Sequence, residues 1–328
     1  MLAALDPLIL ERWAQKIGPD WHGFHLGAIL SVLLISVICG LVGSLVVGNR
    51  MAFFSDAMAH CSFAGISLGL IISFTMGFTP KSEELRWVLP LLMAGFGALV
   101  GLGIAFVGQH TTLASDTVIG VFFAGAIGFG AMILQAFKSR QMFDPERFLF
   151  GGPSLVEPFD LLMLAILLAI TTLILFWRYN HFLFASFNPS LARSRGVMVQ
   201  LNNYVFIVLL ALIVNFSISA VGVLLINALL IVPAATASNL ATNMKSLFRT
   251  TLFISVLTGL VGLYISQAVL LPIGPGEPKQ FGVSGTIICL GVLAFALSMM
   301  MPLLRRKFGA FGSARIAVAR SGDQAPLA

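Results

Sequence analysis

The stretch 50–77, RMAFFSDAMAHCSFAGISLGLIISFTMG, is apolar enough to lie in a bilayer, yet it carries Asp56 and His60 four residues apart. In a helix this spacing places both side chains on one face, one turn apart. An aspartate inside a membrane span costs about 2.5–3.5 kcal/mol on insertion scales. The pair therefore predicts a functional site, and the other apolar segments are interpreted as helices that surround it.

The composition defines the class of protein. Of 328 residues, 58% are hydrophobic and only 10% are charged, and the mean hydropathy is +0.99. Soluble domains carry about 25% charged residues. The apolar runs are long and unbroken, unlike the roughly ten-residue alternating segments of a barrel. An all-α polytopic membrane protein is predicted, and its net charge of +6 indicates orientation in the bilayer rather than a nucleic-acid partner.

Nine apolar runs are long enough, or nearly so, to cross a bilayer. They are 24–47, 51–77, 87–108, 116–137, 157–178, 200–217, 219–238, 246–271 and 283–304. Only the short segment near Ser217–Ser219 separates the sixth run from the seventh, so eight or nine transmembrane helices are expected. Small residues four apart, such as Gly65 and Gly69, predict close helix packing.

Three sections follow from this pattern. Residues 1–23 have the face of an amphipathic helix on the membrane surface, 24–306 form the transmembrane domain, and 307–328 form a cytoplasmic tail. With the N-terminus outside, eleven of the 19 Lys and Arg residues lie on the cytoplasmic side, as the positive-inside rule requires. His22 and His25 either assist metal entry or are ordinary interfacial histidines.

Two acids lie deep in the apolar layout, Asp56 and Asp116, each near the start of a span that runs outward. Together with His60 they can lie at similar depth on neighbouring helices. Two carboxylates and an imidazole can ligate a divalent cation. The alternative is that both acids cap the starts of their helices, where carboxylates are favoured, and that His60 is a core residue with its hydrogen bonds satisfied. Because the Asp–His pair and the second acid are predicted at the same depth in the membrane, the sequence favours a metal site formed by Asp56, His60 and Asp116.

Two further features bear on function. The loop 188–196 has the signature of a short capped helix that binds either lipid headgroups or a cytoplasmic partner, with Asn188, Pro189, Ser190, Leu191, Arg193, Arg195 and Gly196 as its residues. Asn227, a polar residue in an apolar run, is expected to hydrogen-bond to a neighbouring helix.

Motifs of catalysis are missing from the sequence. It has no GxxxxGK[ST], HExxH or GxSxG motif, and its three cysteines have no paired spacing. The chain is therefore expected to be neither an enzyme nor a cofactor-binding protein. If transport is active, its energy comes from another chain or from an ion gradient.

Three segments, in this order, resemble the membrane permease of bacterial ABC-type zinc, manganese and iron uptake systems. They are SDAMAHCSFAGISLGL at 55–70, SDTVIGVFFAGAIGFGAMIL at 115–134 and LLIVPAATA at 229–237, and the resemblance extends over about 24–306. The chain departs from the family pattern at Ser55, usually glycine, and at Asn227, usually valine, serine or threonine. These departures leave the class intact but weaken the choice of metal.

The resemblance implies a type II ABC importer permease in the bacterial inner membrane. It implies a homodimer, two cytoplasmic ATPase subunits that dock on the 188–196 helix, and an extracytoplasmic metal-binding protein. The residues that match the family's metal site are Asp56, His60 and Asp116. The cargo is expected to be zinc, with manganese or iron as alternatives. An ion-coupled secondary transporter without an ATPase is the alternative function.

Overall fold

The computed structural model describes residues 26–75, 83–136, 151, 156, 158–271 and 279–300. The predictions for 1–23 and 307–328, including His22 and His25, lie outside these ranges.

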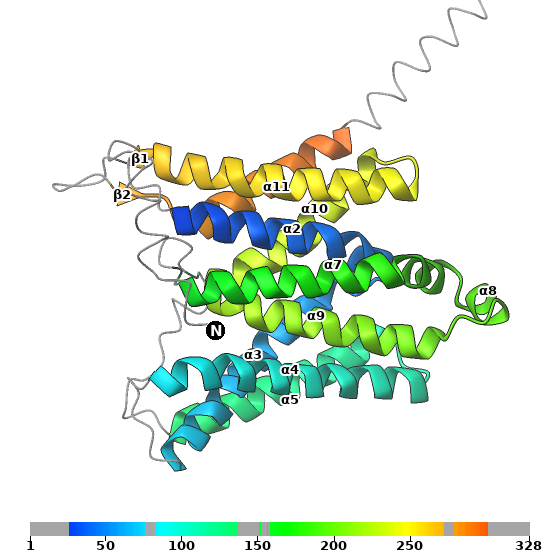
Figure 1. Ribbon diagram of the computed structural model, residues 1–328, viewed down its shortest axis with the longest axis horizontal. Helices are drawn as coiled ribbons and strands as arrows, with labels where there is room; N and C mark the ends of the chain where they lie inside the picture. Colours follow the sequence, from blue (N-terminus) through cyan, green and yellow to red (C-terminus); the bar gives the residue numbers. More distant parts are fainter. Residues whose placement is uncertain are drawn as a thin grey trace, which may run out of the picture.

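Within the described residues, the chain forms nine long helices and one short helix (Figure 1). They are α2 (Leu26–Gly48), α3 (Ala52–Thr75), α4 (Glu83–His110), α5 (Ser115–Ala136), α7 (Pro158–Phe187), α8 (Pro189–Ser194), α9 (Val199–Val221), α10 (Val223–Leu240), α11 (Met244–Ala268) and a final helix, Val283–Met300. Two short antiparallel strands, β1 (Leu270–Leu271) and β2 (Lys279–Gln280), precede the final helix. The predicted all-α membrane fold is confirmed, apart from these strands.

Eight of the described helices are long and apolar enough to cross a membrane. The ninth long helix, α3, has 24 residues, or about 36 Å of helix, which also suffices. It carries Asp56 and His60 in its first half and is otherwise largely apolar. The candidate polar pair therefore lies in a helix that is long enough to span the membrane.

The sixth and seventh apolar runs are separate helices, α9 and α10, but the expected break near Ser217–Ser219 was wrong. The break lies at Gly222, whose φ of +83° is in the left-handed region. Glycine adopts such a φ at no steric cost, whereas the serines remain in α9 because nothing forces the helix to stop there. This one-residue break lets α10 leave the direction of α9 and pack against α2, α3 and α11.

The small residues pack helices closely, as the sequence predicted. A Cβ at Gly65 of α3 would lie 2.9 Å from the Cα of Met93 in α4, and a Cβ at Gly40 of α2 would lie 2.9 Å from the Cα of Leu252 in α11. Contacts this short leave no room for a side chain. In lipid, where burial between helices gains little, such backbone approach is a main source of packing energy.

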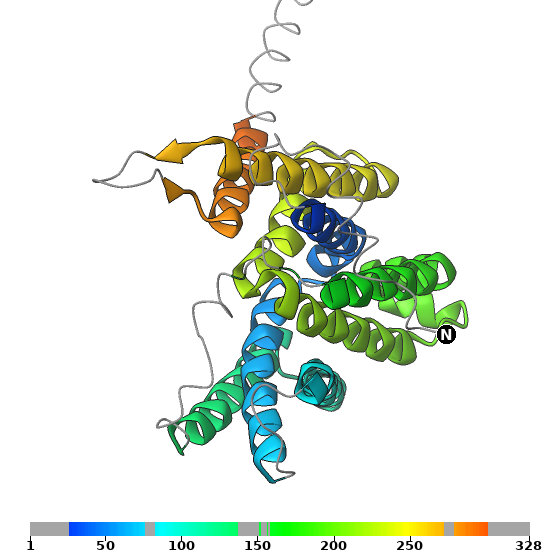
Figure 2. The same ribbon diagram turned by 60° about the vertical axis from the view of Figure 1, so that its left-hand side comes forward.

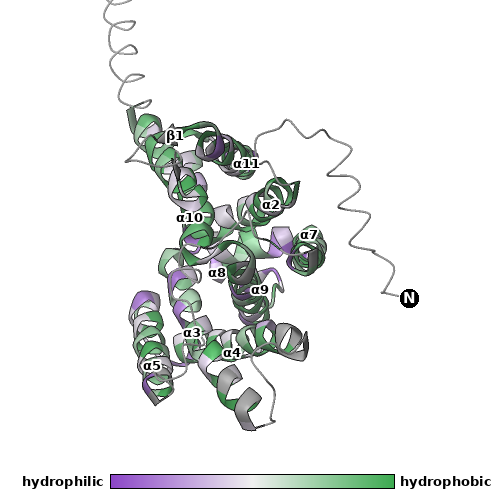
Figure 3. Cartoon of the chain, turned by 90° about the vertical axis from the view of Figure 1, so that its left-hand side faces the viewer, coloured by the Kyte–Doolittle hydropathy of each residue, from purple (hydrophilic) through white to green (hydrophobic). Residues whose placement is uncertain are grey.

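Helix α3 lies between α4 and α5 and reaches the rest of the bundle through α9 and α10 (Figure 2). It packs against α4, α5, α9 and α10, and so connects the α4–α5 part of the molecule to the α2–α10–α11 part (Figure 2). Hydrophobic residues dominate the helices when the chain is viewed from one end (Figure 3). The polar side chains of α3 are therefore placed between helices from both parts of the bundle.

Candidate metal site

The candidate site begins with the two polar side chains of α3. Asp56 is the fifth residue of the helix and His60 lies one turn further along. His60 Nε2 is 3.9 Å from Asp56 Oδ1, so the two groups face each other without a hydrogen bond. The two side chains remain 33% and 46% exposed in the single chain, His60 being the less exposed. The predicted shared face is therefore present and still accessible.

The imidazole of His60 is held from the side by α5. Its ring meets the ring of Phe123 edge to face, with centroids 5.0 Å apart. An aromatic contact of this kind contributes about 0.5–1.5 kcal/mol beyond area burial. Phe123 therefore restricts the orientation of the histidine without using a hydrogen bond, which leaves the ring nitrogens for other partners.

A third polar side chain reaches the pair from α10. Asn227 donates a hydrogen bond from Nδ2 to Asp56 Oδ1, at 2.9 Å. This confirms that Asn227 bonds to a neighbouring helix. Its other end, Oδ1, is buried and accepts no hydrogen bond from the described residues. Sequence reasoning had not included Asn227 in the site, although a polar side chain in the apolar run LLINALLIV was a usable signal.

Asp116 lies on α5, the helix beside α3. The contacts His60–Phe123 and Ser67–Gly130 both join residues 63 positions apart, so the two helices run in the same direction in constant register. On this register Asp116 is level with Phe53, three residues or about 4.5 Å along the axis from Asp56. The two acids thus lie at similar depth, within one helical turn.

Similar depth does not bring the three predicted residues together. Within the ranges that the structure describes, no three His, Cys, Asp or Glu side chains are close enough to hold a metal ion. Asp116 is exposed in the first turn of α5. The arrangement in one chain is therefore an Asp–His pair with an amide beside it and a second carboxylate one turn nearer the start of the helices.

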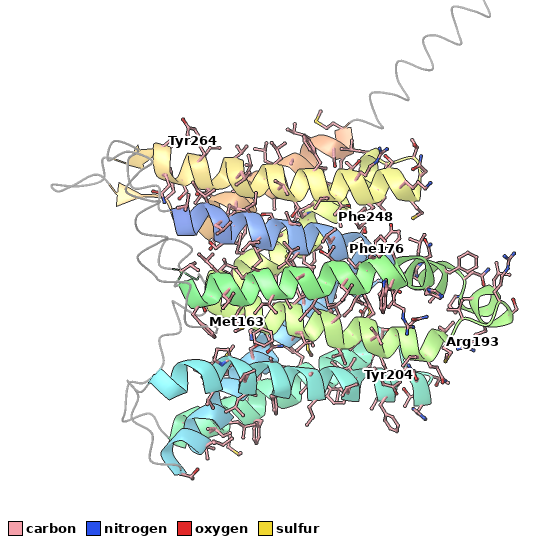
Figure 4. All side chains as sticks on the ribbon, viewed as in Figure 1. Met163, Phe176, Arg193, Tyr204, Phe248 and Tyr264 are labelled. Carbon is pink, nitrogen blue, oxygen red and sulfur yellow. The ribbon has the colours of Figure 1, made fainter. Side chains whose placement is uncertain are left out.

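At one end of the bundle, α8 forms the predicted short helix. Asn188 caps it by accepting a hydrogen bond from the Leu191 amide at 3.0 Å, and Pro189 occupies its first position. Gly196 follows its end with a φ of +76°. Arg193 and Arg195 are exposed, and Arg193 lies at the far end of the molecule (Figure 4).

A hollow of about 650 Å³ opens beside α8. The ends of α2 and α4 and parts of α7, α8 and α9 line it, with Arg50, Gln109, Arg193, Asn202 and Asn203 among its polar residues. Arg178 donates to Asn202 at 2.9 Å and so joins α7 to α9 at this hollow. This end of the molecule is thus concave, polar and basic.

These features define a multi-helix membrane protein, and comparison with known proteins assigns it to a family. The model of the ABC 3 transport family matches residues 22–301, so the chain belongs to that family. The family predicted from the sequence is confirmed. Together with the apolar helices, it makes the chain a multi-pass protein of the bacterial inner membrane and a transport permease subunit.

Named relatives cover most of the chain. The manganese transport system membrane protein MntC of Listeria innocua is 28% identical over 75% of this chain and 82% of the relative. The high-affinity zinc uptake system membrane protein ZnuB of Buchnera aphidicola is 25% identical over 80% of this chain and 92% of the relative. In the structure of PsaBC from Streptococcus pneumoniae, one chain superposes with a TM-score of 0.66 at 23% identity, over 89% of this chain and 94% of that one. That likeness supports the fold.

Proposed function

We propose that this chain is the membrane permease of an ATP-driven importer of divalent transition-metal ions. The observation that carries the proposal is the Asp56–His60 pair on one face of α3, in a chain whose family relatives are named for manganese and zinc transport. A carboxylate and an imidazole are ligands that both metals accept. The sequence favours zinc as the cargo. Manganese is proposed beside it, and iron is a further candidate.

The proposed route passes Asp56 and His60 first. Asp116, about one turn away along α5, then offers a second carboxylate nearer the cytoplasm. A cation moving between them exchanges one anionic partner for another, so no step leaves it in an uncharged apolar environment. The ion is cargo and not a resident cofactor, so the ligands must hold it weakly enough for release.

In the proposed homodimer, the second chain covers the Asp56 and His60 side chains that the single chain leaves partly exposed. Asp56 and His60 lie on a helix packed among others but remain partly exposed in the single chain, where an exposed side chain within a membrane span would meet lipid. Ionisable groups within spans normally face a bundle interior or a water-filled cavity. A second copy of the chain against this side would close the route and remove the carboxylate from lipid.

Energy is proposed to come from two separate ATPase chains docked at α8. The exposed Arg193 and Arg195 and the polar hollow beside them form a surface for a cytoplasmic partner. An extracytoplasmic metal-binding protein would deliver the ion to the opposite end. An ion-coupled secondary transporter needs neither partner, so copurification of an ATPase separates the two functions.

Metal uptake by cells tests the proposal. A strain depleted of this chain should take up less manganese or zinc, measured as cell-associated isotope, and the wild-type chain should restore uptake while His60→Ala should not. Restoration by His60→Ala to the wild-type rate would contradict the assigned site. Unchanged uptake of every divalent metal after depletion would contradict the function.

A further inference from the structure

The amide of Asn227 is only half satisfied. Its Nδ2 donates to Asp56, and this assignment follows because an ionised carboxylate can only accept. Its Oδ1 is therefore the buried end, and none of the described residues donates to it. A buried carbonyl oxygen without a hydrogen-bond partner destabilises the fold by its lost hydration. Such an atom in a native site therefore needs an explanation, such as a ligand that binds to it.

Asn215, which is fully buried, shows what a purely structural amide is like. Asn215 of α9 accepts from Ser62 Oγ at 2.6 Å and donates to the Ala211 carbonyl at 2.7 Å. Both ends of that amide are paired, and the bond from Ser62 joins α9 to α3. Asn227 connects α10 to the same helix through its nitrogen on the Asp56 carboxylate but leaves its oxygen unpaired among the described residues.

The spacing at Asn227 suits a cation. Two oxygens in adjacent positions of an octahedral site, each about 2.1 Å from the metal, lie about 3.0 Å apart. In a tetrahedral site with similar bond lengths they lie about 3.4 Å apart. If the Asn227 amide turns over, its oxygen takes the position now held by Nδ2, 2.9 Å from Asp56 Oδ1. The arrangement matches the octahedral spacing more closely.

We propose that Asn227 is a third ligand of the transported ion and favours manganese over zinc. This inference rests on the proposed function. Without metal, the amide N–H stabilises the Asp56 carboxylate. When the cation arrives, it neutralises Asp56, the amide turns over, and Oδ1 binds the metal. Oxygen ligands suit manganese, whereas zinc gains more from nitrogen and sulfur, so removal of the amide oxygen should affect manganese more.

The test uses the complete transporter, permease with its ATPase and its metal-binding protein, in proteoliposomes supplied with ATP and equimolar Mn²⁺ and Zn²⁺. Asn227→Leu removes the ligand oxygen at similar volume. Asn227→Asp keeps an oxygen but loses the N–H donor, and Asn215→Leu is the matched control on α9. We expect Asn227→Leu to lower the manganese-to-zinc uptake ratio about tenfold, whereas Asn227→Asp and Asn215→Leu keep the ratio near that of the wild type.

The other outcomes separate failure of this inference from failure of the proposed function. If Asn227→Leu and Asn227→Asp lower both metals equally, the amide only orients Asp56 and the inference is overturned. If wild-type proteoliposomes move neither metal, the proposed function fails, which is a separate result. If Asn227→Leu does not accumulate in the membrane, Asn227→Ser provides the comparison, because its hydroxyl is too short to reach the ion. Mn²⁺ binding to the purified complex, followed by electron paramagnetic resonance, should weaken in parallel with the uptake ratio.

Discussion

Asp56 and Asp116 are similar in sequence but differ in surroundings. Each follows a serine near the start of its helix, and the register of α3 with α5 places them within about one turn of each other. Asp56 accepts a hydrogen bond from Asn227 and faces His60, whereas Asp116 is exposed in the first turn of α5. The difference indicates that depth in the membrane alone does not make a site; neighbouring helices must bring partners to it.

The largest expected effect comes from removing the partnered pair. Asp56→Ala and His60→Ala should each lower metal uptake at least about 100-fold, because each deletes a direct ligand. Uptake of radioactive manganese and zinc by cells measures the loss. The amount of chain in the membrane, followed by immunoblot, should stay within a factor of about two, since both side chains are already partly exposed. Normal uptake by either variant contradicts the assigned site.

Charge reversal at α8 separates the site from its energy supply. Arg193→Glu with Arg195→Glu should weaken ATPase copurification and lower coupled transport about tenfold, because these exposed side chains are the basic groups of α8. Metal binding to the purified permease should not change, because neither carboxylate is touched. Wild-type copurification and wild-type coupling together would remove the docking role of α8.

Asp116 should be less sensitive than Asp56. Asp116→Asn removes the second carboxylate of the route at nearly unchanged side-chain size. We expect a loss of uptake of about three- to tenfold and a small loss of stability, because an anionic side chain in the first turn of α5 interacts favourably with the helix dipole. Uptake by Asp116→Asn at the wild-type rate would leave Asp116 only a role at the helix start.

The smallest effect is expected at Phe123. Phe123→Leu keeps an apolar side chain but loses the edge-to-face contact with His60, which contributes about 0.5–1.5 kcal/mol. Metal affinity should fall about two- to tenfold while the chain accumulates normally. Isothermal titration of the purified complex measures this change. An unaltered affinity would mean that His60 is positioned without the help of α5.

The spans could be predicted because their signal is local. Long apolar runs and the cap of Asn188 act through residues nearby in the chain, and the spacing of the glycines is visible locally although they pack against other helices. The break at Gly222 was misplaced because a single glycine and two serines are similar signals in one sequence. The structure shows that the glycine, with its positive φ, ends the helix.

The site was only partly predictable. The Asp56–His60 pair follows from helical spacing, which requires no knowledge of the tertiary structure. Asn227 lies 171 residues further along, and only the packing of α10 on α3 brings it to Asp56. Depth also suggested that Asp116 joins the pair, but among the described residues no three His, Cys, Asp or Glu side chains are grouped closely enough for a metal ion, and Asp116 is exposed in the first turn of α5.

The most direct test of the central claim is the position of the metal in the assembled transporter. The complex should be loaded with Mn²⁺, and the ion located from anomalous scattering at the manganese edge in crystals. We predict one peak per chain with Asp56 and His60 among its ligands, at metal–ligand distances of about 2.0–2.2 Å, and with Asn227 Oδ1 turned toward it. A peak elsewhere in the membrane region, with Asp56 still hydrogen-bonded to Asn227 Nδ2, would contradict the account.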